Sequence, residues 1–145
     1  AVLDVGCGYN EFKGKIDNLI GIDPYNDLAD FKTGTLDYKT DEKFDVILCL
    51  GSVNFGNRDK IIAEMEKCVE LLADGGTMFF RVNPGVQHDK PEAKWIEFYA
   101  WNVPFIIELS NMFDLDILDI RDDTNQRKYF ILRKKLTNLA KESKI

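Results

Sequence analysis

The sequence predicts an α/β layered fold built on a mostly parallel sheet. Three observations support this class. Short apolar runs alternate with polar or helical stretches, several runs are continuously apolar like strands buried on both faces, and the first run breaks into a Gly-x-Gly turn at Gly6 and Gly8. A strand that ends directly in such a turn is typical of a loop whose backbone approaches a ligand closely.

Five apolar runs are predicted as strands, and a hairpin is expected near the end of the chain. The five runs are Val2–Val5, Leu19–Ile22, a weaker run at 33–36, Phe44–Leu50 and 77–82. The β-rich runs at 115–120 and 129–132 are joined by a polar connection, which predicts the hairpin. We therefore expect one domain at residues 1–135, followed by a basic tail at 136–145.

Two helices are predicted between these strands. The first covers 58–72, where apolar side chains recur at helical spacing and Asp59 lies in the first turn; Gly75 and Gly76 are expected to end it. The second is expected to begin at Asn102 as its N-cap and to end near Phe113.

Composition and charge exclude several classes of protein. Of the 145 residues, 45% are apolar and 30% are charged, which suits one globular domain. The chain has neither a run long enough to cross a membrane nor a basic leader, so we expect a cytoplasmic protein. Three cysteines without metal-ligand spacing predict neither a disulfide framework nor a metal site.

The net charge of −6 is unevenly spread along the chain. Residues 1–120 contain 22 acids and 11 bases, whereas residues 121–145 contain 3 acids and 8 bases. An acidic body repels phosphates, so a broad nucleic-acid surface is disfavoured. The basic end remains available for an anionic partner.

Polar and glycine residues follow each predicted parallel strand, where ligands bind in open α/β sheets. They are Gly6, Cys7, Gly8, Tyr9 and Asn10 after the first strand, Asp23, Pro24 and Tyr25 after the second, Asp37 and Tyr38 after the third, and Gly51, Ser52, Val53 and Asn54 after the fourth. Asp23 lies at the spacing where a carboxylate binds both ribose hydroxyls, which indicates an adenosine-type ligand.

The glycine loop disfavours a cofactor bound through phosphates. Glu11 stands where a dinucleotide fingerprint has its third glycine, and a carboxylate there would repel pyrophosphate. The loop that begins at Gly51 lacks the lysine of an ATP-type phosphate loop. A cofactor with adenosine at one end and a zwitterionic, cationic tail fits the acidic loop better.

The ordered set of motifs resembles the class I S-adenosylmethionine-dependent methyltransferases. Leu3-Asp4-Val5-Gly6-Cys7-Gly8 is similar to their first motif and Gly21-Ile22-Asp23 to their second. Asp37, the run at 44–47 and the turn at 71–77 are similar to the later motifs, so the resemblance spans roughly residues 1–135. It implies a Rossmann-like, doubly wound sheet of about seven strands in a three-layer sandwich, with the last strand antiparallel.

The resemblance also implies that S-adenosyl-L-methionine is the cofactor, with S-adenosyl-L-homocysteine as its product. The residues implied at its methionine end are Asp4, Gly6, Cys7, Gly8, Leu50 and Gly51. At its nucleoside end, Asp23 would hold the ribose, Pro24 would pack on adenine, and Asp37 with the Tyr38 backbone would bind the adenine amino group. Asp4 could instead stabilise the loop, and Tyr38 could simply pack on the surface.

Two departures from the family pattern concern the same region. Asn10 replaces the third glycine of the first motif, although asparagine also adopts left-handed torsions. The stretch from there to Leu19 is short, which predicts that the first helix is truncated or replaced by a loop. The sequence begins almost inside the first strand, so we expect an open pocket or preceding residues outside this sequence.

The predicted reaction is an in-line methyl transfer, which depends mainly on alignment and exclusion of water. His88 is the candidate general base, should the acceptor need to lose a proton. The candidate acceptor site comprises Asn54, Arg81, His88, Trp95 and Tyr99. DNA amino methylation is disfavoured, because the Pro-Pro-Tyr motif of amino-group DNA methyltransferases is absent after the fourth strand. The leading hypothesis is an enzyme that methylates a small molecule or an exposed protein group, with a small molecule favoured. The alternatives are an RNA or nucleotide methyltransferase that uses the basic tail, and an inactive cofactor-binding partner subunit.

Overall fold

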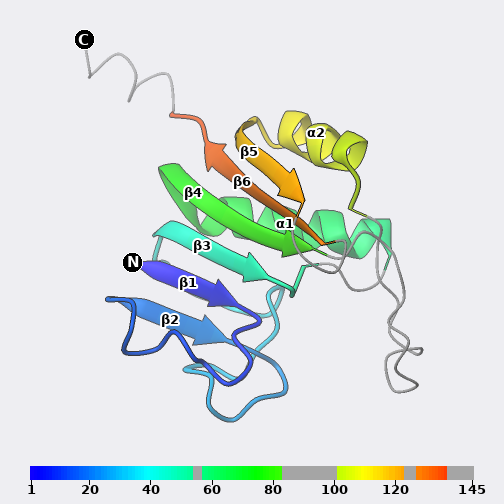
Figure 1. The fold of residues 1–145 in the computed structure, drawn as a ribbon. Coiled ribbons are helices and arrows are strands. Elements are labelled where there is room, and N and C mark those ends of the chain that lie inside the picture. The colour runs from blue at the N-terminus through cyan, green and yellow to red at the C-terminus, as the bar shows by residue number, and fades with distance from the viewer. Residues whose placement is uncertain (54–56, 83–100, 123–126, 137–145) are drawn as a thin grey trace, which may run out of the picture.

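The described part of the chain forms one twisted sheet that carries two helices (Figure 1). The computed structural model describes residues 1–53, 57–82, 101–122 and 127–136. The elements in chain order are β1 (Val2–Val5), β2 (Leu19–Ile22), β3 (Phe44–Leu50), α1 (Arg58–Leu71), β4 (Leu72–Val82), α2 (Val103–Met112), β5 (Leu115–Asp122) and β6 (Lys128–Lys134).

The strands follow the order β2-β1-β3-β4-β6-β5 across the sheet. The first four strands of this order run parallel, and β6 lies antiparallel between β4 and β5. Asp4 of β1 pairs with Gly21 of β2 and Leu48 of β3, which aligns the carboxyl ends of these strands at one edge (Figure 1). The predicted mostly parallel sheet with an antiparallel C-terminal hairpin is confirmed.

Residues 33–36, predicted as a strand, do not form one. One isolated parallel bridge joins Ile22, the last residue of β2, to Phe31, and the chain then turns as the Asp37 amide donates to the Gly34 carbonyl at 3.3 Å. The segment has no apolar face to bury, since its one large apolar side chain, Leu36, is 49% exposed. The described residues therefore form six strands, and the seventh strand expected at this position is absent.

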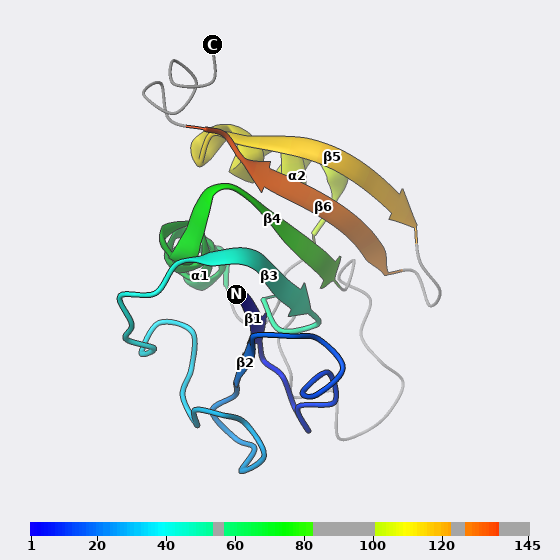
Figure 2. The ribbon, with the colours of Figure 1, turned by 90° about the vertical axis from the view of Figure 1, so that its left-hand side faces the viewer.

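Both helices lie on the same face of the sheet, so the described elements make two layers instead of the expected three-layer sandwich (Figure 2). The connections at 6–18 and 23–43 contain no helix. Left-handed torsions at Asn10, Gly14 and Asn18 interrupt the first connection, and a right-handed helix cannot run through them. The expectation that a loop replaces the first helix is confirmed.

Asparagine side chains begin both helices. Asn57 accepts a hydrogen bond from the Lys60 amide at 3.0 Å at the start of α1. Asn102, the predicted N-cap of α2, accepts one from the Phe105 amide at 2.9 Å. Among the described helices, neither is long and apolar enough to span a membrane.

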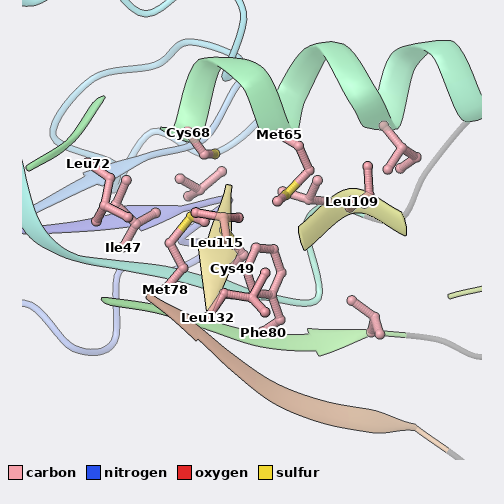
Figure 3. Packing of buried hydrophobic residues seen from close by; sticks show 14 of the residues in the cluster. Ile47, Cys49, Met65, Cys68, Leu72, Met78, Phe80, Leu109, Leu115 and Leu132 are labelled. Carbon is pink, nitrogen blue, oxygen red and sulfur yellow. The ribbon is translucent and has the colours of Figure 1, made fainter. Parts of the chain in front are cut away.

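The core lies between the sheet and the two helices (Figure 3). One buried cluster contains Ile47 of β3, Phe80 of β4, Met65 of α1 and Leu109 of α2. These side chains are all fully buried. Helix α1 lies beside the carboxyl ends of β1 and β3, and it forms one wall of the candidate site.

Candidate functional site

A cavity of about 320 Å³ opens at the carboxyl ends of β1, β2 and β3. The loop after β1, the turn after β2, the end of β3 and one side of α1 contribute to its wall. Among the lining residues are Gly6, Asp23, Pro24, Gly51, Lys60 and Glu64. Four of these were predicted from the sequence as cofactor-binding residues, whereas Lys60 and Glu64 were not.

The loop after β1 is held against two neighbouring strands. Gly6 and Gly8 have φ angles of 69° and 57°, in the left-handed region that favours glycine. The amides of Gly6 and Cys7 both donate to the carbonyl of Ile22, at 2.8 and 2.9 Å. A Cβ atom on Gly6 would lie 2.4 Å from the Cβ of Ser52, so only glycine fits against the end of β3. Bare main chain therefore forms this side of the cavity.

The Asp23 carboxylate connects this loop to the turn after β2. Its Oδ2 accepts a hydrogen bond from the Gly8 amide at 3.0 Å, and its Oδ1 accepts one from the Tyr25 amide at 2.8 Å. Two backbone donors thus fix the position of the side chain. Because each carboxylate oxygen has two lone pairs, both oxygens can still accept a bond from a ligand hydroxyl.

Asn10 adopts the left-handed conformation expected of it, with φ of 58°. Its Nδ2 donates to the Leu28 carbonyl at 3.1 Å, and it packs so closely on Gly21 that a Cβ there would lie 2.3 Å from its Oδ1. Asp30 completes the support, because its Oδ2 accepts from the Gly21 amide at 2.8 Å. The turn therefore survives the loss of the third glycine.

Carboxyl groups lie close to the loop after β1. Asp4 is 4% exposed, and burial together with the neighbouring Asp23 raises the pKa of its carboxyl to about 6. Burial, Asp4 and Asp23 raise the pKa of the Cys7 thiol to about 11. Burial is the first cause of both shifts, and the neighbouring carboxylates add to them. The carboxylates of Asp4 and Asp23 beside the loop favour a cationic ligand group over a phosphate.

Glu64 and Lys60 enter the cavity from α1. Glu64 is 9% exposed and occupies the buried stripe of the helix with Ile61, Met65 and Cys68. Burial raises the pKa of its carboxyl, and Lys60 opposes the change from 3.8 Å away. The sequence contained a signal for this residue, because a lone carboxyl stands at a core position of the helical repeat.

The other predicted cofactor residues are not among those that line this cavity, namely Asp4, Cys7, Gly8, Asp37, Tyr38 and Leu50. Asp37 and Tyr38 line a second, shallower hollow with Lys39, and they do not line the first cavity. Leu50 ends β3 and is 37% exposed.

The predicted acceptor residues are only partly visible. Arg81 pairs in register with Leu50 at the carboxyl end of β4. Asn54, His88, Trp95 and Tyr99 lie outside the described residues.

Solved structures share this fold at low sequence identity. The N-methyltransferase NodS of Bradyrhizobium japonicum, crystallised with S-adenosylhomocysteine, is 17% identical, with a TM-score of 0.68 over 92% of this chain and 76% of that one. The 1,6-didemethyltoxoflavin N1-methyltransferase of Burkholderia thailandensis is 16% identical, with a TM-score of 0.72 over 92% and 70%.

A third similar structure is CalS10, an amino pentose methyltransferase of Micromonospora echinaspora with bound S-adenosylmethionine. It is 13% identical, with a TM-score of 0.69 over 92% of this chain and 83% of that one. No protein-family model and no curated protein matches the sequence. The likeness therefore shows that the chain has the fold of these methyltransferases.

Proposed function

We propose that the chain is an S-adenosylmethionine-dependent methyltransferase that acts on a small-molecule acceptor. The observation that carries this proposal is the Asp23 carboxylate, held by the backbone amides of Gly8 and Tyr25 on the wall of the cavity. This arrangement suits a ribose diol, which donates two hydrogen bonds to one carboxylate. The fold shared with three methyltransferases of known structure supports the same interpretation.

The residues of the cavity fit S-adenosylmethionine better than a phosphate-bearing cofactor. The backbone at Gly6 and Gly51, which line the cavity, and at the nearby Gly8 would receive the methionine end, and Cys7 and Leu50 flank these glycines. The buried Asp4 would stabilise its ammonium group through the local field. Pro24, on the same cavity wall as Asp23, would pack on the base.

When bound, this cofactor supplies a methyl group already activated by a positively charged sulfur. The chain then needs to orient the cofactor, align the acceptor and exclude water, which requires no catalytic side chain. Gly6 and Asp23 would fix the cofactor between β1 and β2.

The acceptor site is a proposal that follows from strand order. Arg81 lies one residue before the end of β4 and pairs in register with Leu50, the last residue of β3, and an arginine there suits an anionic or polar acceptor. His88 would act as a base for an acceptor that must lose a proton, with Asn54, Trp95 and Tyr99 completing the pocket. Two similar structures are named for small acceptors, a didemethyltoxoflavin and an amino pentose, which supports a small molecule here.

Calorimetric titration with S-adenosylmethionine and S-adenosylhomocysteine tests the proposal. We expect both to bind the native protein, whereas NAD does not. Asp23→Ala should lower the affinity at least tenfold, which corresponds to about 1.4 kcal/mol. Asp27→Ala is the matched control, because Asp27 lies in the same connection but is exposed and pairs with Lys32 at the surface.

Two results would contradict the proposal. If neither sulfur nucleoside binds the native protein, the cavity is not a cofactor site. If both bind but Asp23→Ala and Asp27→Ala behave alike while circular dichroism shows both folded, the ribose lies elsewhere. An RNA acceptor would be indicated instead if RNA binding weakens steeply with salt.

A further inference from the structure

Two polar side chains line the cavity where the residues after β3 and helix α1 meet it. The Oγ of Ser52 is buried and has no hydrogen-bond partner within the described residues. The carboxylate of Glu64 is nearest to the Lys60 ammonium, but 3.8 Å between Oε1 and Nζ is too long for a hydrogen bond. Both residues line the cavity that also contains Asp23.

The burial of the Glu64 carboxyl is unfavourable for folding when no ligand is bound. A carboxyl buried beside Ile61, Met65 and Cys68 loses hydration, and it gains no direct hydrogen bond within the described chain. A leucine or methionine at this position would complete the apolar stripe of α1. A buried polar group that packing does not explain points to a ligand group bound there.

Asp23 and Glu64 line the same cavity. On the proposed function, the ribose lies against Asp23 and the methionine end lies against Gly6 and Gly51, which leaves the rest of the cavity for the base. We propose that Glu64 binds the amino edge of adenine. This inference rests on the proposed function and identifies the residue of α1 that selects the base.

A carboxyl group can pair with the amino part of that edge. Burial raises the pKa of the Glu64 carboxyl and Lys60 lowers it, and in either protonation state the group keeps an oxygen that accepts a hydrogen bond. Adenine places an amino donor beside a ring-nitrogen acceptor. The adenine amino group can therefore donate a hydrogen bond to Glu64. Asp37, which the resemblance assigns to the same amino group, lines the other hollow.

Binding measurements on the full chain test this inference with two ligands. They are S-adenosylhomocysteine and its analogue in which purine, without the 6-amino group, replaces adenine. We expect the native protein to prefer the adenine compound about tenfold, as for one hydrogen bond to a buried partner. Glu64→Met should abolish the preference, and Glu64→Gln should retain it, because an amide also offers an acceptor oxygen to the adenine amino group.

Glu66→Met is the matched control, because Glu66 is an exposed glutamate on the same helix; it should keep the native preference. Glu64→Ala replaces the methionine variant should that variant fail to fold. A folded Glu64→Met or Glu64→Ala protein with the native preference would overturn the inference, as would loss of the preference in Asp37→Asn alone. If the native protein binds neither ligand, the proposed function itself fails.

Discussion

Replacing Asp4 by asparagine should stabilise the free protein at neutral pH. The side chain is 4% exposed, and burial with the nearby Asp23 carboxylate raises its pKa from the ordinary 3.8 to about 6. Each pH unit of this displacement is worth about 1.4 kcal/mol, so ionised Asp4 destabilises the fold by about 3 kcal/mol. The asparagine side chain has nearly the same shape as the aspartate and carries no charge.

The sign of the pH dependence follows from proton binding. Between pH 4 and 6 the folded protein holds a proton on Asp4 that the unfolded chain has released. The contribution of Asp4 to stability is therefore complete below about pH 4 and is lost as the pH rises through about 6. Urea unfolding should show Asp4→Asn more stable than the native protein by about 3 kcal/mol at pH 7.5, with most of the difference gone at pH 4.

Asp41→Asn serves as the control, because Asp41 is an exposed aspartate. It should show no such pH-dependent gain. A native-like stability of Asp4→Asn at pH 7.5 would refute the reasoning, since it would mean that ionised Asp4 does not destabilise the fold. The same variant should bind S-adenosylhomocysteine more weakly, because it removes the negative charge that favours the ligand ammonium.

Three further substitutions test how the site and its supports are built. Gly6→Ala should lower the free energy of unfolding by about 2 kcal/mol or more and abolish cofactor binding in calorimetry, because it adds a left-handed strain and a clash with Ser52. Asn57→Ala removes the N-cap of α1 and should cost about 1 kcal/mol in urea unfolding. Lys134→Met removes two hydrogen bonds of 2.9 Å to carbonyls near the end of α1, and should lower the melting temperature without changing cofactor affinity.

Some features of the site could be predicted from the sequence, because they depend on residues that are neighbours along the chain. The left-handed turn at Gly6 and Gly8, and its tolerance of Asn10, follow from local torsional preferences. The N-cap at Asn102 and the apolar stripe of α1 are likewise local patterns. Contacts between distant segments, such as the hydrogen bond from the Gly8 amide to Asp23, could not be predicted from the sequence.

The sequence alone determined the alternation of strands and helices, the antiparallel end of the sheet and the glycine turn with its nearby carboxylate. Only the tertiary structure decided that both described helices cover one face, that residues 33–36 turn away from the sheet, and that Glu64 and Asp23 line one cavity. The reason is physical: torsional preference and hydrophobic period act within a few residues, whereas burial and the fields of charged groups depend on which distant segments pack together.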